Sequence, residues 1–181
     1  MSNTYVFESE RLGFRRWQAS DRNAFSSMNA DPTVMEYFPN VLTKEESDLL
    51  IERFEQHFVE KGYGLWAVEI KENQEFIGFI GLLEVNIDID FKKSIEIGWR
   101  LDKKNWKKGY AVEGATACVD YAFNVLKMNE IYSFTSLLNK PSETVMKRIG
   151  MIKVKEFDHP NVEIDSPLRR HVLYKMQNTS G

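Results

Sequence analysis

The sequence has few of the residues that cross-link small proteins or bind metals. Among its 181 residues, one is cysteine and three are histidine. A lone cysteine, Cys118, cannot form an internal disulfide, and no Cys/His cluster has zinc-ligand spacing, so we expect a reducing compartment and no metal site. No apolar run reaches the roughly 18 residues of a membrane span, and the amino-terminal residues lack the pattern of an export signal. These absences favour a cytoplasmic protein without a membrane partner.

An excess of charge of one sign is also absent. The chain has 24 Lys and Arg against 27 Asp and Glu, a net charge of −3. This balance excludes the basic surface typical of a nucleic-acid-binding protein. Hydrophobic residues make up 43% of the chain, which is enough for a packed core. Because no Pro/Gly/Ser-rich linker divides the sequence, residues 1–181 are predicted to form one domain.

The hydrophobic pattern predicts a mixed sheet with helices. Thr43 to Glu46 has the sequence of a capping box, and Leu50, Phe54 and Phe58 follow at four-residue intervals, so a helix is expected to run to Gly62. Three further helices are predicted: one over residues 21–30, one that begins at residue 109, and one that begins after a cap at Asn139 or Ser142. Strands are predicted at residues 12–17, 65–70, 75–85, 94–101, 131–137, 151–157 and 171–176.

The order of these elements decides the fold class. The three strands between residues 65 and 101 follow one another without a helix, so we expect them to pair antiparallel, with an acidic turn at Asp88–Asp90. Strands and helices alternate strictly in a doubly wound sheet, and here they do not. The order predicts a mixed α/β (α+β) sheet flanked by helices.

The stretch from Trp99 to Gly114 is the most informative for function. A strand ends, a short basic loop follows, and a helix begins near Gly109. The first turn of a helix has unpaired N–H groups and the positive end of the helix dipole, so it binds anions. Gly109 and Ala111 are small enough for close approach, and Lys107 and Lys108 add positive charge. The pattern predicts a pyrophosphate cradle; the alternative is a solvated loop that ends in a capping glycine.

Two other phosphate-binding motifs fit less well. A P-loop requires Gly-Lys-Ser/Thr, but Gly109 is followed by Tyr110. The spacing Gly109-x-Ala111-x-x-Gly114 is a degenerate dinucleotide fingerprint. A dinucleotide fold also needs an acidic residue near the end of the next strand to hold the ribose, and residues 136–139 offer none.

Several segments resemble the GNAT superfamily of N-acetyltransferases, most closely the RimJ/RimL-like branch that acetylates ribosomal-protein N-termini. In chain order they are 8–15 (ESERLGFR), 64–68 (GLWAV), 77–82 (IGFIGL), 96–101 (EIGWRL), 106–113 (WKKGYAVE), 139–142 (NKPS) and 148–151 (RIGM). Together they extend over nearly the whole chain. The resemblance implies the GNAT fold, with a mostly antiparallel sheet and one splayed strand pair. It also implies that the enzyme moves the acetyl group of acetyl-CoA directly to a primary amine.

The resemblance also implies where coenzyme A binds. Residues 106–111 match the family's pyrophosphate loop, with Trp106 in place of the usual Gln or Arg. The strand 97–101 would splay from its neighbour and lend backbone groups to the pantetheine arm, and one of its amides would polarise the thioester carbonyl. The implied cofactor contacts are Ile97, Trp99, Arg100, Leu101, Trp106, Lys107, Lys108, Gly109, Tyr110, Ala111, Val112, Asn139 and Ser142.

Acyl transfer to an amine requires a neutral amine, a stabilised oxyanion and a proton for the leaving thiolate. Many superfamily members donate that proton from a tyrosine seven residues after the asparagine, where this chain has Met146. In the branch that the chain resembles, the serine three residues after the asparagine takes the role, which makes Ser142 the candidate acid; the alternative is a capping hydroxyl. Glu96 is the candidate base, and the alternative is a carboxylate paired with a basic residue across the sheet.

The acceptor pocket is less clearly indicated. His159 and His171 flank a proline-marked loop and are candidates to line the pocket or accept a proton, although a histidine on a strand more often has a structural role. Tyr37 and Trp66 are candidates for the pocket wall, with core packing as the alternative. The acceptor is expected to be a protein N-terminal amine or a small amine, and the enzyme a monomer or homodimer. The missing tyrosine keeps a non-catalytic acyl-CoA-binding module open as the alternative function.

Overall fold

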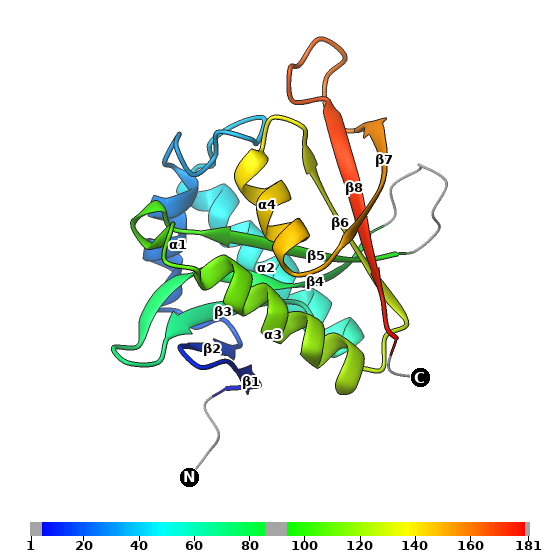
Figure 1. Cartoon of the computed structure of the whole chain (residues 1–181). Helices are drawn as coiled ribbons and strands as arrows, with labels where there is room; N and C mark the ends of the chain where they lie inside the picture. Colours follow the sequence, from blue (N-terminus) through cyan, green and yellow to red (C-terminus); the bar gives the residue numbers. More distant parts are fainter. Residues whose placement is uncertain (1–4, 86–93, 180–181) are drawn as a thin grey trace.

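The computed structural model describes residues 5–85 and 94–179, and its strands form one mixed sheet in the order β1-β2-β3-β4-β5-β6-β8-β7 (Figure 1). The strands are β1 (Phe7–Glu8), β2 (Leu12–Arg15), β3 (Leu65–Ile70), β4 (Glu75–Val85), β5 (Ser94–Leu101), β6 (Glu130–Ser136), β7 (Ile152–Asp158) and β8 (Arg170–Gln177). The helices are α1 (Asp21–Asn29), α2 (Lys44–Lys61), α3 (Tyr110–Asn124) and α4 (Lys140–Arg148), with a 3-10 turn at Lys103–Asn105. The predicted mixed sheet flanked by helices is confirmed.

The helices cover both faces of the sheet. α3 and α4 lie in front of it and α1 and α2 behind it (Figure 1). The predicted antiparallel pairing of β3, β4 and β5 is confirmed. The acidic turn expected at Asp88–Asp90 lies outside the described residues. The sequence did not predict β1 or the 3-10 turn, because segments of two and three residues are too short to show a period.

Local signals fix the ends of α2 as expected. The Thr43 hydroxyl accepts from the Glu46 N–H at 3.1 Å, and the Glu46 carboxylate accepts from the Thr43 N–H at 2.7 Å, which completes the capping box. Gly62 ends the helix in the left-handed conformation (φ 78°). The buried face between these ends includes Ile51, Phe54 and Phe58, so α2 is held against the sheet.

α3 lies directly on the opposite face of the sheet. A Cβ atom at Gly114 would be 2.4 Å from Cδ1 of Ile80 on β4, so a larger residue here would require the buried Ile80 side chain to move. Ala115, Cys118 and Ala122 continue the small buried side of the helix. This close packing fixes the amino-terminal end of α3 relative to the strands beside it.

The sheet opens between β5 and β6. These two strands are parallel and pair at a single position, Glu96 with Tyr132, whereas β6 pairs with β8 along its whole length. Beyond that position the Ser133 hydroxyl donates to the Ile97 carbonyl at 3.0 Å, and no further strand pairing joins the two described segments. The splayed strand pair expected of the fold is therefore present, and it creates the opening in which the candidate site lies.

Candidate active site

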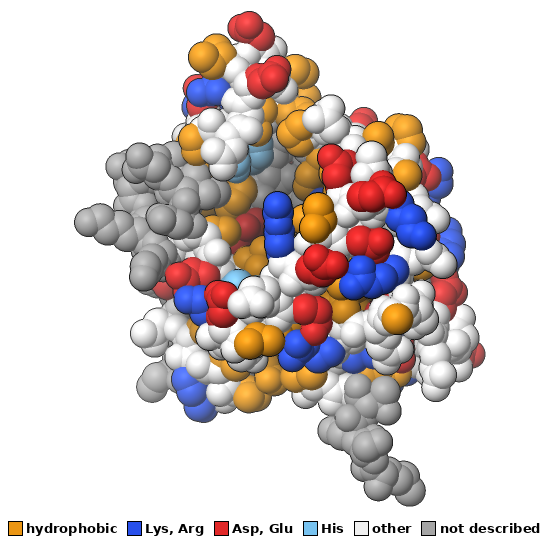
Figure 2. All heavy atoms as spheres, turned by 180° about the vertical axis from the view of Figure 1, so that it is seen from behind, with side chains coloured by type: hydrophobic (Ala, Val, Ile, Leu, Met, Phe, Trp, Pro, Cys, Tyr) orange, Lys and Arg blue, Asp and Glu red, His pale blue; other side chains and the backbone are white. Residues whose placement is uncertain are grey.

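A cavity of about 810 Å³ occupies the opening between β5 and β6. Its walls come from these strands, the α1–α2 connection, the first turns of α3 and α4, and the β7–β8 connection. That connection projects from the body of the molecule in Figure 1, and Figure 2 shows histidine side chains at its base. The cavity brings together most of the predicted site residues: Tyr37, Glu96, Trp99, Arg100, Leu101, Trp106, Lys107, Gly109, Tyr110, Ala111, Val112, Asn139, Ser142, His159 and His171.

The amino-terminal end of α3 faces this cavity without a side-chain cap. Gly109 is its N-cap residue and adopts φ 84°, a left-handed conformation that favours glycine, and no side chain accepts a hydrogen bond there. Lys107, two residues earlier, also has a positive φ of 60°. The acidic residue of the first turn, Glu113, accepts from Ser9 and Arg11 instead. The free N–H groups and the helix dipole therefore suit an anion such as a pyrophosphate.

Two side chains hold the loop before α3 in place. Arg11 donates to the Lys108 carbonyl at 3.1 Å and to Glu113 at 2.6 Å, and its guanidinium lies 4.5 Å from the centre of the Tyr110 ring. Trp106 donates its indole N–H to the Leu101 carbonyl at 2.7 Å. Sequence reasoning missed the role of Arg11, because a contact across 97 residues leaves no local signal.

The opened edge of β5 presents backbone groups to the cavity. The carbonyls of Ile97 and Leu101 both point toward the opening, since they accept from Ser133 and Trp106. Backbone groups alternate between the two edges of a strand, so the N–H and C=O of Trp99 point the same way. These two groups lie midway along the splayed segment, where an amide-containing arm can pair with them.

Glu96 lies where the opening begins. Its carboxyl lines the cavity, and burial raises its pKa to about 8. Within residues 5–85 and 94–179 it has no hydrogen bond or ion pair, so the paired carboxylate that the sequence left open is not found there. A carboxyl with this pKa exists in both protonation states near neutral pH.

Asn139, not Ser142, caps α4. The Asn139 side chain accepts from the Ser142 N–H at 3.2 Å and donates to the Thr135 hydroxyl at 3.0 Å. The Ser142 hydroxyl lines the cavity and has no hydrogen bond with the part of the chain that the structure describes. The capping alternative for Ser142 is therefore wrong. Met146, one helical turn further on, is buried against the core.

His159 and His171 form a pair at the base of the β7–β8 connection, with ring centres 4.8 Å apart. Desolvation lowers the pKa of both imidazoles, which favours their neutral forms. Nδ1 of His159 accepts from the Asn161 N–H at 3.2 Å, whereas Nδ1 of His171 lies 3.0 Å from the Arg169 carbonyl and donates to it. We assign the tautomers from these contacts, which leave Nε2 of His171 as an acceptor.

One expectation needs correction. Trp66 is 1% exposed and packs against Phe7 and Tyr121 in the core, so its predicted place in the pocket wall is wrong. Side chains alternate along a strand, and on β3 it is Leu65 that faces the cavity. The cofactor contacts expected of Ile97 and Lys108 are backbone contacts and stay a prediction; the Ile97 side chain is fully buried, and the Lys108 amine donates to Asn105.

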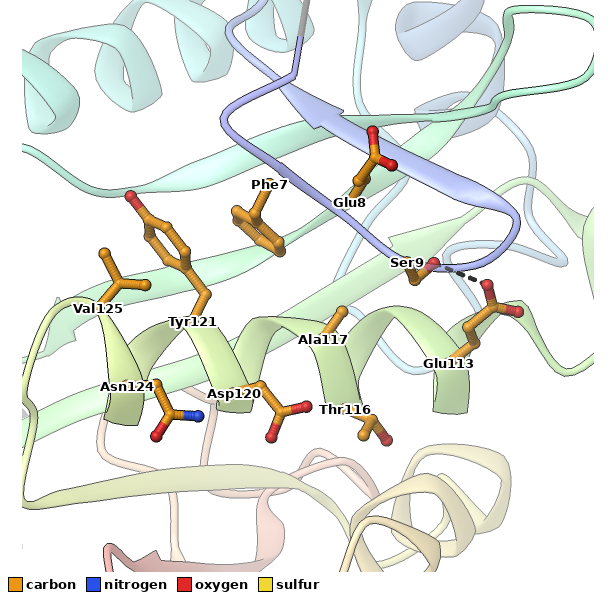
Figure 3. A pocket seen from close by; sticks show the side chains of 10 residues that line it. All are labelled: Phe7, Glu8, Ser9, Glu113, Thr116, Ala117, Asp120, Tyr121, Asn124 and Val125. Carbon is orange, nitrogen blue, oxygen red and sulfur yellow. Dashed lines mark hydrogen bonds between the residues drawn. The ribbon is translucent and has the colours of Figure 1, made fainter. Parts of the chain in front are cut away.

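A second pocket, of about 560 Å³, lies between β1 and α3 (Figure 3). It shares no lining residue with the first. Of its polar side chains, Glu113 accepts from Ser9 at 2.7 Å, and the Tyr121 ring stacks on Phe7 at 4.5 Å between ring centres (Figure 3). Because the larger cavity contains most of the predicted site residues and this pocket contains none, the larger cavity is the candidate active site.

The thiol and the metal-ligating side chains of the described residues form no alternative centre. Burial raises the pKa of the Cys118 thiol, so a thiolate nucleophile is disfavoured there. In the described ranges, no group of three or more His, Cys, Asp or Glu side chains is arranged to hold a metal ion. No helix in these ranges is long and apolar enough to cross a membrane.

Comparison with known proteins identifies the family. Residues 11–152 match the family model for the acetyltransferase (GNAT) domain. The uncharacterized protein YkkB of Bacillus subtilis is 32% identical over 146 residues, which cover 79% of this chain and 83% of YkkB. The N-acetyltransferase YnaD of the same species, also uncharacterized, is 30% identical over 144 residues (79% and 80%). A GNAT-family acetyltransferase from Bacillus anthracis has a similar structure, with a TM-score of 0.78 and 25% identity over 94% of this chain and 97% of that one. The chain therefore belongs to the GNAT acetyltransferase family and is an acetyl-CoA-dependent N-acetyltransferase.

Proposed function

We propose that the protein transfers the acetyl group of acetyl-CoA directly to the primary amine of an acceptor that enters the cavity beside Glu96. The observation that carries this proposal is that one cavity contains both an uncapped helix end, suited to the pyrophosphate, and an unpaired carboxyl with a pKa near 8. Transfer through a covalent enzyme intermediate is not favoured, because the single cysteine is buried and its thiol pKa is raised.

The residues around the opening are suited to hold coenzyme A. The N–H groups of the first turn of α3 and the side chain of Lys107 would bind the pyrophosphate. The free N–H and C=O of Trp99 would pair with the pantetheine amides, with Asn139 at the entrance to the opening. Bound acetyl-CoA supplies a thioester carbonyl as the acetyl donor, and the β5 amides are positioned to stabilise negative charge on its oxygen.

Two side chains are proposed to move protons. The ionised carboxylate of Glu96 accepts a proton from the acceptor ammonium, directly or through one water. Its pKa of about 8 lies close to that of an α-amino group, about 7.7–8.0, so this transfer is nearly balanced in free energy. The Ser142 hydroxyl, which has no other hydrogen bond with the described residues, donates a proton to the leaving thiolate sulfur and takes up the proton that the acceptor nitrogen loses as the amide forms.

Neighbours with the same fold act on different acceptors. A spermidine N-acetyltransferase from Vibrio cholerae, solved with CoA and spermine, has a TM-score of 0.74 and 19% identity over 93% of this chain and 96% of that one. A ribosomal-protein-S5-alanine acetyltransferase from Vibrio fischeri has a TM-score of 0.76 and 18% identity over 96% and 97%. We propose that this chain belongs to the RimJ/RimL-like branch, on the strength of the motifs around Glu96, Gly109 and Ser142.

The test is acetyl-CoA turnover with a panel of amines, measured as release of free thiol. Thermal stabilisation by acetyl-CoA and coenzyme A, but not by a nicotinamide dinucleotide, is expected first. Wild type should then release thiol with at least one amine, and Ser142→Ala and Glu96→Gln should lower kcat while both still bind coenzyme A. Binding of acetyl-CoA with no thiol release for any amine would overturn the proposed transfer and favour a non-catalytic acyl-CoA-binding module.

A further inference from the structure

Arg100 lines the cavity and has an unusual environment there. Its guanidinium carbon lies 4.2 Å from the centre of the Phe38 ring and 5.4 Å from that of Phe79. One of its nitrogens, Nη1, donates to the Asn29 side chain at 2.8 Å. Asn29 is itself buried and held by the Ser47 hydroxyl at 3.1 Å. The guanidinium is therefore fixed between two aromatic rings by a buried polar chain.

What Arg100 lacks is a negative partner. Its Nε is buried and has no hydrogen-bond acceptor, and no carboxylate of the described residues forms an ion pair with it. Burial lowers its pKa to about 10, so it is still cationic at neutral pH. A buried charge without a partner costs several kcal/mol, so a cation left in this state points to a ligand that neutralises it.

Arg15, a buried arginine elsewhere in this protein, shows the contrast. Arg15 donates to Glu69 at 2.6 Å and to both carboxylate oxygens of Asp21 at 2.8 and 2.9 Å. All three side chains are buried, and the ion pairs compensate the cost of burying them. At Arg100 the protein supplies a neutral amide and two aromatic rings instead, and it leaves the Nε edge of the guanidinium without a carboxylate.

Alternation along β5 places Arg100 on the same side as Glu96. Residues 96, 98 and 100 share one face of the strand, and all three line the cavity. The Cα atoms of Glu96 and Arg100 are separated by roughly 13 Å on a rise of about 3.3 Å per residue. An acceptor whose amine lies at Glu96 therefore extends along β5 toward Arg100.

We propose that Arg100 binds a carboxylate of the acceptor, so that the substrates are primary amines that carry a carboxylate several bonds from the amine. This inference rests on the proposed function, because it takes the amine to react beside Glu96. A guanidinium fork matches a carboxylate with two parallel hydrogen bonds, which favours a carboxylate over an uncharged polar group. A free ω-amino acid and a peptide with an acidic side chain near its N-terminus both carry this chemistry.

Matched acceptors test the proposal. One pair is 6-aminohexanoate and 6-aminohexanamide; the other is the dipeptide amides Ala-Glu and Ala-Gln, so the two pairs distinguish a free amino acid from a peptide. We expect kcat/KM to be about 10- to 100-fold higher for the carboxylate of at least one pair, the range of a charge-assisted hydrogen bond. Arg100→Met should remove this preference, Arg100→Lys should keep part of it, and Arg53→Met, at an exposed arginine on α2, should leave it unchanged.

A binding measurement separates this inference from the proposed function. Hexanoate, which has no amine, should bind the coenzyme A-loaded wild type more tightly than hexanamide, and Arg100→Met should abolish the difference. Equal turnover of carboxylates and amides with no preferred binding of hexanoate overturns the inference and leaves acetyl transfer intact. Preferred binding of hexanoate that depends on Arg100, without acetylation of any amine, supports the carboxylate site and overturns the transfer reaction.

Discussion

Glu96→Gln is the most informative single substitution in this protein. Glutamine keeps the size of the side chain and cannot ionise. The Glu96 pKa is about 8 in the folded protein, against an ordinary value of 4.5. The folded state therefore keeps this proton between these two values while the unfolded chain releases it, so stability falls as pH rises through this window. Glutamine at position 96 does not carry this cost.

The expected magnitude follows from the pKa difference. Each unit is worth about 1.4 kcal/mol, and water in the cavity reduces the full effect. We therefore expect the free energy of unfolding of Glu96→Gln, relative to wild type, to increase by about 1–3 kcal/mol between pH 5 and pH 8. Urea unfolding at both pH values measures this difference, and Glu52→Gln, at an exposed site on α2, controls for the loss of one surface charge.

The same substitution that stabilises the protein at high pH is expected to lower kcat/KM. Below pH 8 the ionised fraction of Glu96 falls about tenfold per pH unit, to roughly one in ten molecules at pH 7. With an acceptor amine of pKa about 10.4, which is an ammonium throughout this range, wild-type kcat/KM should therefore rise about tenfold from pH 6 to pH 7 and level off above pH 8. In Glu96→Gln only amine that is already neutral in solution can react, so its kcat/KM should continue to rise about tenfold per unit above pH 8. A wild-type profile that also continues to rise above pH 8, together with an unfolding difference that does not change with pH, would refute both the assigned pKa and the base role.

Three further substitutions test other parts of the site. Ser142→Ala should lower kcat by about 100-fold or more, measured by stopped-flow, and leave the Kd for coenzyme A unchanged, measured by calorimetry. A higher Kd with an unchanged kcat would contradict the acid role. Gly109→Ala should cost about 1–2 kcal/mol of stability, because φ is 84° and the new Cβ would lie 3.3 Å from the Arg11 guanidinium; it should also raise the Kd for coenzyme A. Trp66→Ala should lower stability by about 3–5 kcal/mol while KM for the amine stays within twofold, since Trp66 lies in the core; a selective rise in KM would return it to the pocket wall.

Local signals in the sequence predicted most of the fold. The Thr43 capping box and the glycine at position 62 define α2 because both act within one turn of the chain. The order of strands and helices was enough to identify a mixed sheet. The two-residue β1 was not predictable, since its pairing with β2 depends on the tertiary fold.

The site was only partly predictable for the same reason. The motif at residues 106–113 shows the start of α3, but the contact of Arg11 with the Lys108 carbonyl joins distant segments. Trp66 was misplaced because the sequence does not show which face of a strand meets the cavity. Arg100 was expected to contribute backbone groups to the cofactor site, and nothing in the sequence indicated that its side chain contacts Asn29 and Phe38. These contacts depend on how the helices pack on the sheet, and the spacing of residues in the sequence does not show that packing.

The single pairing between β5 and β6 has a consequence for the cooperativity of unfolding. One part of the sheet, β1 to β5, and the other, β6 with β8 and β7, are joined by the Glu96–Tyr132 pair and the Ser133–Ile97 hydrogen bond. A molecule that binds in the opening bridges both parts. Without it, amide protons of β6 and β8 should exchange with solvent through local openings that leave β3 and β4 protected. With coenzyme A bound, amide protons of β6 and β8 should exchange only through global unfolding, as those of β3 and β4 do, because the cofactor supplies hydrogen bonds between β5 and β6 that the sheet itself lacks.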